Sequence, residues 1–455
     1  MRILLISANK NRTPYPVYPL GLSVVMNALL REGHQVDVFD CMFDSANILT
    51  DKLLSYIPDV VGISIRNIDN TNMNEPESYL DFVVNICETV KKTVSSKIIL
   101  GGAGFSLMPE YVMSLTNADY GVVGEGEYVF VDILHKIANG KRPLNQILYS
   151  SESSTDNEIS SANYDGVLLS KYYQLNGFMG SLQTKRGCLN KCVYCTYPKL
   201  EGNQINSRSP SAVVNDIERL IGTGAKFLFF TDSLFNDSYG TYMPILREMK
   251  KRKITTPWTA YFQPSGIESA TVELMKETGL SAVELGADAS TDITLKKLGK
   301  NFTFSDVKKS VSIFNDFEIP AAVYYIFGGP GETEETVHDG IANILSLYAV
   351  SFIGVGIRIY PGTQIEKIAI SEGMFDRTTS FHEPQYYFSN KVNKKWIDDK
   401  LTESFKDTKR VVYPLTKFDE LTDAMYKMGY SGVLWDLLLK DKIKNKKLIS
   451  EQIFI

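Results

Sequence analysis

Three cysteines crowded into one short segment constrain this chain more than any other feature of its sequence. Cys188, Cys192 and Cys195 form a Cys-x3-Cys-x2-Cys pattern, while the other two cysteines, Cys41 and Cys87, lie far upstream. A disulfide framework uses an even number of well-spread cysteines in a small secreted chain, so this pattern indicates a thiolate site in a reduced compartment. Three thiolates on one loop can bind three corners of an iron–sulfur cube and leave the fourth iron open.

A structural zinc site is the alternative for these thiolates. Zinc is usually held by four ligands, often as two Cys-x2-Cys pairs. A histidine would be the usual fourth ligand, but none is near the cysteine segment: the chain has only His34, His135, His338 and His382. We therefore expect a [4Fe–4S] cluster rather than zinc.

The composition is that of an ordinary globular protein. The length of 455 residues corresponds to two to four domains, and 44% of the residues are hydrophobic and 22% charged. The net charge of −5 argues against a nucleic-acid partner. No apolar run reaches the ~18 residues of a membrane span, and the apolar start Met1–Ile6 is too short for a secretion signal. We expect a cytoplasmic protein with no integral membrane segment.

Residues 1–145 alternate short β-rich runs with amphipathic stretches, which is the pattern of a parallel sheet with crossover helices. The predicted strands are Arg2–Ala8, Gln35–Asp40, Asp59–Ile65, Lys97–Gly102 and Asp119–Val123. The predicted helices are Pro19–Arg31, Ala46–Tyr56, Tyr79–Val94, Pro109–Leu115 and Glu127–Asn139. This order predicts a doubly wound, flavodoxin-like or Rossmann-like α/β domain that binds ligands at the carboxyl ends of its strands. Residues 146–177, which include the serine-rich Ser150–Asp165, are the expected linker.

Residues 178–365 repeat the alternation with a longer period. The predicted strands are Met179–Lys185, Lys226–Asp232, Trp258–Phe262, Ala282–Gly286, Ala321–Phe327 and Ile353–Tyr360. The predicted helices are Ser211–Gly222, Tyr239–Lys251, Glu268–Thr278, Ser305–Asn315 and Thr333–Leu347. Six such units fall short of the eight that close a full barrel, and they predict a partial (β/α)6 barrel.

Residues 366–455 predict a small, mostly helical C-terminal cap. Its expected helices are Lys394–Phe405 and Phe418–Leu439. Its aromatic segment, Phe381–Phe388, is expected to line the substrate.

The segment Arg186–Cys195, directly after the first barrel strand, resembles the cluster motif of the radical S-adenosylmethionine (SAM) superfamily. In that family three cysteines hold a [4Fe–4S] cluster, and SAM chelates its open iron. The resemblance implies that Cys188, Cys192 and Cys195 are the cluster ligands. It also implies that Tyr194, the aromatic residue before the third cysteine, lies against the adenine of SAM.

The ends of the later barrel strands carry further matches to this family. Glu284–Ser290 resembles its Gly-x-Glu-Ser motif with an aspartate in place of the glutamate, Phe327–Thr333 its glycine–proline motif, and Arg358–Thr363 the end of its sixth strand. The resemblance implies that Asp232 binds the methionyl amino group of SAM and that Arg358 binds its methionyl carboxylate. It also implies that the ribose contacts Gly286, Asp288 and Ser290, and that the adenine contacts Gly328 and Gly329. Taken alone, Ser290 also fits a helix N-cap, and the two glycines also fit a turn.

The first domain resembles the cobalamin-binding domains of the cobalamin-dependent branch of this superfamily. The matching segments are Pro19–Leu22, Gly33–Val36, Gly62–Ser64, Leu100–Gly102 and Gly124–Glu127. The implied cobalamin contacts are Asn9, Ser64, Gly101, Gly102, Glu125 and Gly126. Many such domains carry Asp-x-His-x-x-Gly after the first strand, but Asn9–Thr13 contains no histidine, so we expect cobalamin without a protein histidine ligand. A domain of this fold that binds nothing is the open alternative.

Together these resemblances imply a cobalamin-dependent radical SAM enzyme. We expect it to generate a 5′-deoxyadenosyl radical and to act as a C-methyltransferase on an unactivated centre of a small-molecule or lipid-like substrate. The alternative is a cobalamin-assisted cyclisation or rearrangement without net methyl transfer. A flavodoxin or ferredoxin is the expected electron donor, and the sequence does not identify the catalytic acid or base.

Overall fold

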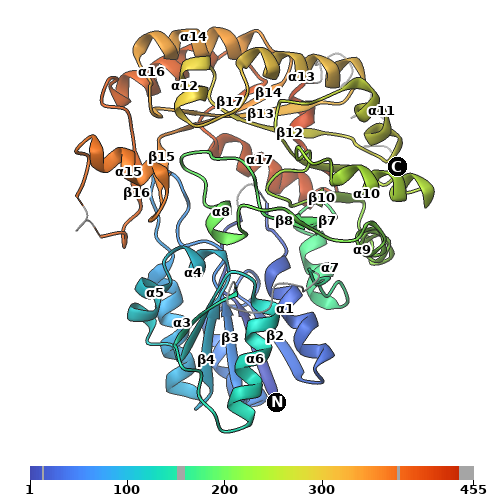
Figure 1. The fold of residues 1–455 in the computed structure, drawn as a ribbon, viewed down its shortest axis with the longest axis vertical. Coiled ribbons are helices and arrows are strands. Elements are labelled where there is room, and N and C mark those ends of the chain that lie inside the picture. The colour runs from blue at the N-terminus through green and yellow to red at the C-terminus, as the bar shows by residue number, and fades with distance from the viewer. Residues whose placement is uncertain (13–14, 151–158, 377–379, 440–455) are drawn as a thin grey trace.

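Two parallel sheets, one in each of two lobes, form the framework of the computed structural model, which describes residues 1–12, 15–150, 159–376 and 380–439 (Figure 1). The first sheet has the strand order β2-β1-β3-β4-β5-β6, and all its pairings are parallel. Its strands are β1 (Arg2–Ser7), β2 (Gln35–Asp40), β3 (Val60–Ser64), β4 (Lys97–Gly101), β5 (Tyr120–Val123) and β6 (Ile147–Tyr149).

Helices cover both faces of the first sheet because its strands are apolar on both sides. In β1, Ile3 and Leu5 pack with one set of helices, and Leu4 and Ile6 pack with the other. The first set is α1 (Leu20–Arg31) and α6 (Gly126–Ala138), and the second is α2 (Ala46–Tyr56), α3 (Leu80–Thr93), α4 (Ala103–Leu107) and α5 (Pro109–Thr116). This arrangement confirms the predicted doubly wound domain.

The first sheet has one strand more than the sequence predicts. β6 pairs with β5 and lies in the segment expected to be linker, beyond residue 145. A strand of three residues is too short for a period-two pattern to stand out. Residues 151–158 of that expected linker lie outside the described residues.

The second sheet has the order β17-β14-β13-β12-β11-β10-β7, again with parallel pairings throughout. Its strands are β7 (Met179–Leu182), β10 (Phe227–Phe230), β11 (Trp258–Phe262), β12 (Val283–Asp288), β13 (Ala321–Phe327), β14 (Val350–Val355) and β17 (Val411–Val412). The first six follow one another in chain order and confirm the partial barrel. The seventh, β17, comes from the C-terminal region that the sequence predicts as helical.

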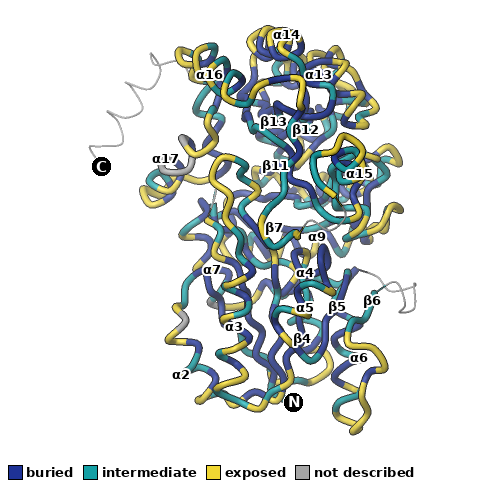
Figure 2. The backbone as a smooth tube through the Cα atoms, turned by 90° about the vertical axis from the view of Figure 1, so that its left-hand side faces the viewer, coloured by how far each residue is buried: buried dark blue, intermediate teal, exposed yellow. Residues whose placement is uncertain are grey.

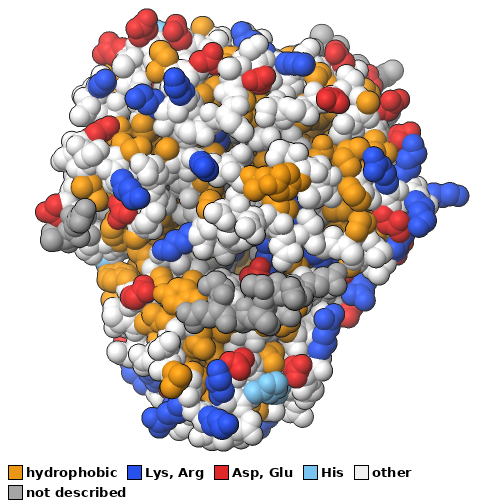
Figure 3. All heavy atoms as spheres, in the orientation of Figure 1, with side chains coloured by type: hydrophobic (Ala, Val, Ile, Leu, Met, Phe, Trp, Pro, Cys, Tyr) orange, Lys and Arg blue, Asp and Glu red, His pale blue; other side chains and the backbone are white. Residues whose placement is uncertain are grey.

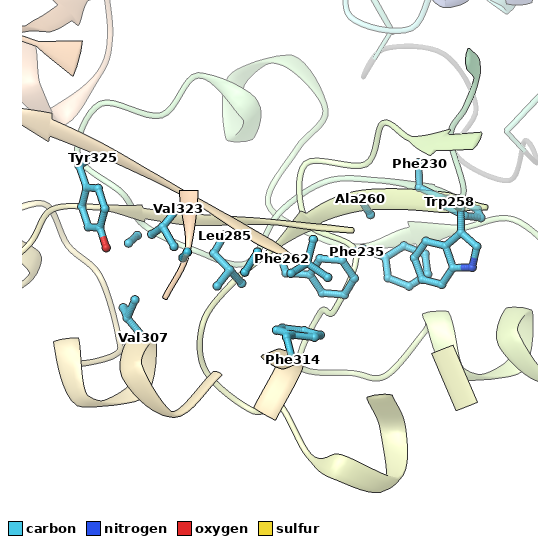
Figure 4. Close-up of a cluster of buried hydrophobic side chains, with 14 of the residues drawn as sticks. Phe230, Phe235, Trp258, Ala260, Phe262, Leu285, Val307, Phe314, Val323 and Tyr325 are labelled. Carbon is cyan, nitrogen blue, oxygen red and sulfur yellow. The ribbon is translucent and has the colours of Figure 1, made fainter. Parts of the chain in front are cut away.

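Helices line the outside of the barrel and fix which side chains face inward. Alternate strand residues, such as Phe262, Leu285 and Val323, point toward Val307 and Phe314 of helix α13 (Figure 4). The residues between them therefore face the barrel interior. The helices of this lobe are α7 (Val167–Tyr173), α8 (Tyr197–Leu200), α9 (Pro210–Gly222), α10 (Tyr242–Lys251), α11 (Ser269–Glu277), α12 (Asp292–Lys297), α13 (Phe304–Asp316) and α14 (Glu334–Leu345).

The C-terminal region differs most from the prediction. The expected strand Ile353–Tyr360 is interrupted by Gly356, whose φ of +76° ends β14 and redirects the chain into β15 (Ile357–Ile359). β15 forms an antiparallel pair with β16 (Gln385–Tyr387). The expected helix Phe418–Leu439 is split, because Gly429 and Gly432 both have positive φ. The elements of this region are α15 (Gln364–Ser371), α16 (Lys394–Phe405), α17 (Thr416–Lys427) and the 3-10 helix η2 (Trp435–Leu439).

The surface carries both signs of charge. The strands are largely buried, and exposed residues gather on the surrounding helices and loops (Figure 2). On the face shown in Figure 3, basic and acidic side chains are interspersed rather than collected into one patch. No helix in the described part of the chain combines the length and the apolar character needed to cross a membrane.

Candidate functional site

A cavity of about 650 Å³ lies between the two lobes. The second lobe contributes residues such as Ser181, Gln183 and Arg186 to its wall. The first lobe contributes the carboxyl ends of its strands, and all six residues predicted to contact cobalamin line the cavity: Asn9, Ser64, Gly101, Gly102, Glu125 and Gly126. The switch point between β1 and β3 therefore faces this cavity, which is where a doubly wound sheet binds its ligand.

Backbone geometry explains one of the glycines at this edge. Gly102 has a φ of +92°, and a Cβ there would lie 2.6 Å from the carbonyl oxygen of Ile65. A side chain at Gly102 would therefore push the ends of β3 and β4 apart. Among the described residues that line this cavity there is no histidine. His34 lies at the opposite edge of the sheet, where its Nδ1 is 3.4 Å from the amino nitrogen of Met1.

The cysteine segment begins where the short strand β8 (Lys185–Arg186) ends. β8 pairs with β9 (Asn206–Ser207), and this pairing brings Gln204 against Gly187. Gly187 has a φ of +93°, and a Cβ there would overlap the carbonyl oxygen of Gln204. The position directly before Cys188 therefore requires glycine.

Backbone hydrogen bonds fix the rest of the cysteine segment. The Cys188 amide donates to the Gly202 carbonyl at 3.2 Å. The Val193 amide donates to the Leu298 carbonyl at 3.0 Å, and the Val193 carbonyl accepts from the Ile365 amide at 2.8 Å. The segment is thus attached to the barrel on two sides.

The chemistry of the three cysteines fits an iron–sulfur cluster. All three are free, Cys188 is buried, and the three sulfurs influence one another electrostatically. Burial raises the pKa of Cys192 and raises that of Cys195 to about 12, and a bound metal would displace these thiol protons. Among the described residues no three cysteine, histidine or acidic side chains converge closely enough to hold one metal ion. A [4Fe–4S] cluster takes one thiolate on each of three irons, so its ligands do not have to meet at one metal ion.

Two predicted SAM residues, Tyr194 and Asp288, meet beside the cysteines. The Tyr194 hydroxyl donates to Asp288 Oδ2 at 2.5 Å. The sequence prediction did not include Lys300, whose ammonium forms an ion pair with Asp288, donates to the carbonyl of Gly286 at 3.3 Å and interacts with Cys192. Burial works against its charge, but Asp288 and Cys192 outweigh burial and raise the pKa of Lys300. A positive charge therefore lies next to Cys192, one of the predicted cluster ligands.

The structure gives Asp232 and Ser290 partners other than those that the resemblance implies. The Asp232 carboxylate is fully buried and accepts from the Thr184 amide at 2.7 Å and the Thr184 hydroxyl at 2.5 Å, so it holds the chain after β7. Ser290 is packed against Gly340 of α14, and Thr291, not Ser290, caps helix α12. The contacts of these two side chains with SAM stay predictions.

Gly328 and Gly329 form the turn that the local sequence predicts. Gly328 has a φ of +83°, and a Cβ there would lie 2.5 Å from the Phe388 ring. The Gly328 amide donates to the carboxylate of Glu332 at 3.2 Å, which fixes the turn at the end of β13. Burial raises the pKa of Glu332 to about 7. The adenine contact of these glycines stays a prediction.

Arg358 contacts the other lobe rather than the cysteine segment. Its guanidinium donates to Asp69 Oδ2 at 2.8 Å and lies 4.6 Å from the centre of the Tyr360 ring. Both charged groups of this ion pair are almost completely buried. Asp69 therefore pairs with the Arg358 charge, and the predicted contact with the methionyl carboxylate stays a prediction. The sequence gives no signal that links residues so far apart.

A second buried ion pair joins the lobes next to the cysteine segment. Arg186 donates to Glu127 Oε1 at 2.7 Å, and Glu125 Oε1 lies 3.1 Å from the same nitrogen. Glu127 is 2% exposed. This pair ties the first turn of α6, at the wall of the cavity, to strand β8, which leads into the cysteine segment.

Replacing Arg186 with methionine should destabilise the protein by about 3–5 kcal/mol, because Glu127 would be left as a buried, unpaired charge. Urea unfolding followed by circular dichroism measures this loss. Lys92→Met, which removes a pair exposed on the surface of α3, is the control and should have little effect. Equal losses in the two variants would contradict the role given to Arg186.

Comparisons with known proteins agree with this division into lobes. Residues 6–134 match the model of the B12 binding domain, and residues 182–342 match that of the Radical SAM superfamily. Tryptophan 2-C-methyltransferase from Streptomyces laurentii is 27% identical over 433 residues, covering 78% of this chain and 72% of that protein.

Two solved structures share the fold. The structure of the radical SAM methyltransferase TsrM from Kitasatospora setae, with tryptophan and a SAM analogue bound, has a TM-score of 0.84 at 23% identity and covers 99% of each chain. The cobalamin-dependent enzyme OxsB, with aqua-cobalamin and SAM bound, has a TM-score of 0.68 at 16% identity, covering 94% of this chain and 71% of that one. With a B12-binding domain in its first lobe and a radical SAM domain in its second, the chain belongs to the cobalamin-dependent radical SAM family.

Proposed function

We propose that this protein is a C-methyltransferase that uses cobalamin, a [4Fe–4S] cluster and SAM. The observation that carries the proposal is the shared cavity, because the strand ends of the B12-binding domain and the start of the radical SAM barrel line one space. When bound, the cluster and SAM supply radical chemistry and cobalamin supplies a transferable methyl group. The protein supplies their positions and excludes water.

Named residues perform this positioning. Cys188, Cys192 and Cys195 are the proposed cluster ligands, on a segment that Gly187 allows to turn. Gly101 and Gly102 let the corrin approach the backbone at the ends of β4. The Arg186–Glu127 pair holds the two sets of residues at a fixed separation.

The substrate in this proposal is a small molecule. The relative from Streptomyces laurentii is named for methylation of tryptophan, and the TsrM structure contains tryptophan as substrate.

The proposal also includes an electron donor, which is a flavodoxin or ferredoxin. The proposed domain boundaries stay at residues 145, 177 and 365. Strand β6 extends the first sheet beyond residue 145, and strand β17 extends the second sheet beyond residue 365.

Methyl transfer can be tested without knowing the substrate. Protein reconstituted anaerobically with cluster and reduced cobalamin is incubated with SAM labelled in its methyl group. We expect S-adenosylhomocysteine to form and the label to move to the corrinoid. Formation of 5′-deoxyadenosine alone, with the label still on SAM, would overturn methyl transfer and favour the rearrangement alternative.

A further inference from the structure

The inner face of the barrel holds one carboxylate that none of the proposed cofactor contacts uses. Phe262 and Leu285 point outward to the helices (Figure 4), so Tyr261 and Glu284, their neighbours in the chain, face inward. Tyr261 and Glu284 are also direct partners in the β11–β12 pairing. They therefore lie side by side inside the barrel.

Glu284 lacks a cation to balance its charge. It is 3% exposed, and its oxygens accept from the Tyr324 hydroxyl at 2.8 Å and, at the longer distance of 3.5 Å, from the Trp435 indole nitrogen. No lysine, arginine or histidine within the described part of the chain forms an ion pair with it. A carboxylate can accept about four hydrogen bonds, and a buried charge is normally paired. Burial accordingly raises the pKa of Glu284 to about 7.

The space beside Glu284 is open and bordered by an aromatic ring. Tyr261 is 40% exposed although it lies inside the barrel. Cβ atoms added at Gly286 or Gly354, which share the inner face with Glu284 and Phe352, would meet nothing closer than 3.7 Å. Arg66 and Tyr197, which line the cavity between the lobes, act electrostatically on Tyr261. The exposed ring of Tyr261 is therefore near residues of the cavity wall.

We propose that the substrate of this enzyme carries a protonated amine that binds the Glu284 carboxylate, with a flat apolar part against the Tyr261 ring. The inference rests on the proposed function, because it assigns this space to the substrate. An ammonium would supply the cation that Glu284 lacks. The exposed ring of Tyr261 would cover one face of a planar group.

A matched pair of probes tests the amine separately from the ring. Tryptamine and 3-ethylindole share the indole ring, but only tryptamine carries an ammonium. Isothermal titration calorimetry uses protein loaded with cluster and cobalamin, without reductant, so that no turnover is needed. We expect tryptamine to bind at least about ten-fold more tightly than 3-ethylindole. Glu284→Gln should weaken tryptamine at least about ten-fold and leave 3-ethylindole unchanged.

Two further variants guard against a general disturbance of the barrel. Tyr324→Phe removes a donor from Glu284 and increases its need for a cation, so tryptamine affinity should be kept or increased. Glu372→Gln changes another tyrosine-bonded carboxylate, outside the barrel interior, and should change nothing. Equal binding of the two probes, unchanged tryptamine binding in Glu284→Gln, loss of binding in Tyr324→Phe, or no binding of tryptamine would each overturn the proposal. Failure of methyl transfer with this binding intact would count only against the proposed function.

Discussion

Replacing Gly187 with alanine should reduce the iron and sulfide bound by the reconstituted protein to about a tenth or less, although all three cysteines remain. The new Cβ would overlap the Gln204 carbonyl oxygen, and the left-handed backbone at this position adds further strain. Relief of the overlap must move either Cys188 or the β8–β9 pairing that positions it. Iron and sulfide analysis, together with the electron paramagnetic resonance of the reduced cluster, measures the effect.

Gly202→Ala is the matched control for this prediction. Gly202 lies in the same region, has a similar φ of +89°, and its carbonyl accepts from the Cys188 amide. A Cβ at Gly202 would meet no atom within 4 Å, so this variant carries the backbone strain without the overlap. It should keep most of its iron. Normal cluster content in Gly187→Ala would contradict the steric explanation.

Replacing Lys300 with methionine should make the cluster harder to reduce. The Lys300 ammonium lies next to Cys192, and it stabilises the additional negative charge of the reduced cluster. Removal of this charge also leaves Asp288 uncompensated. We expect the equilibrium constant for one-electron reduction to fall at least about ten-fold, a decrease of about 59 mV in midpoint potential. A redox titration monitored by electron paramagnetic resonance, without SAM, measures this potential.

A variant that is expected to shift the midpoint potential in the opposite direction separates this charge effect from structural damage. Asp288→Asn removes the negative partner of Lys300 and should raise the midpoint potential. Lys300→Arg should stay close to the wild type because it keeps the charge. Lys296→Met removes an exposed charge from the same segment and should cause no measurable shift. A potential that falls in both Lys300→Met and Asp288→Asn would rule out the proposed electrostatic effect.

The parts of this molecule that follow local patterns could be predicted from the sequence. The strands of both sheets are apolar runs followed by amphipathic helices, and their order determines which strand ends meet. This is why the predicted cobalamin residues Asn9, Ser64 and Gly101, which follow or end different strands, line one cavity. Cys188, Cys192 and Cys195 could be recognised as candidate cluster ligands because their spacing is contained in a single loop.

The parts that depend on contacts between distant residues could not be predicted. Arg358 was expected at the methionyl carboxylate, but its partner is Asp69, a residue of the other lobe. Lys300 approaches Cys192 only because the chain turns back after α12. The strands β6 and β17 have three and two residues, and each exists only because a neighbouring strand offers an open edge. No periodicity within such short segments reports these contacts.

The position of Arg186 has a consequence for how this protein can vary in evolution. Arg186, which pairs with Glu127 of the B12-binding domain, is separated from Cys188, the first proposed cluster ligand, by Gly187 alone. In the proposed enzyme, a change in how the B12-binding domain sits against Arg186 would therefore pass to Cys188 through a single residue. Insertions in loops far from both inter-lobe ion pairs would leave this link unchanged.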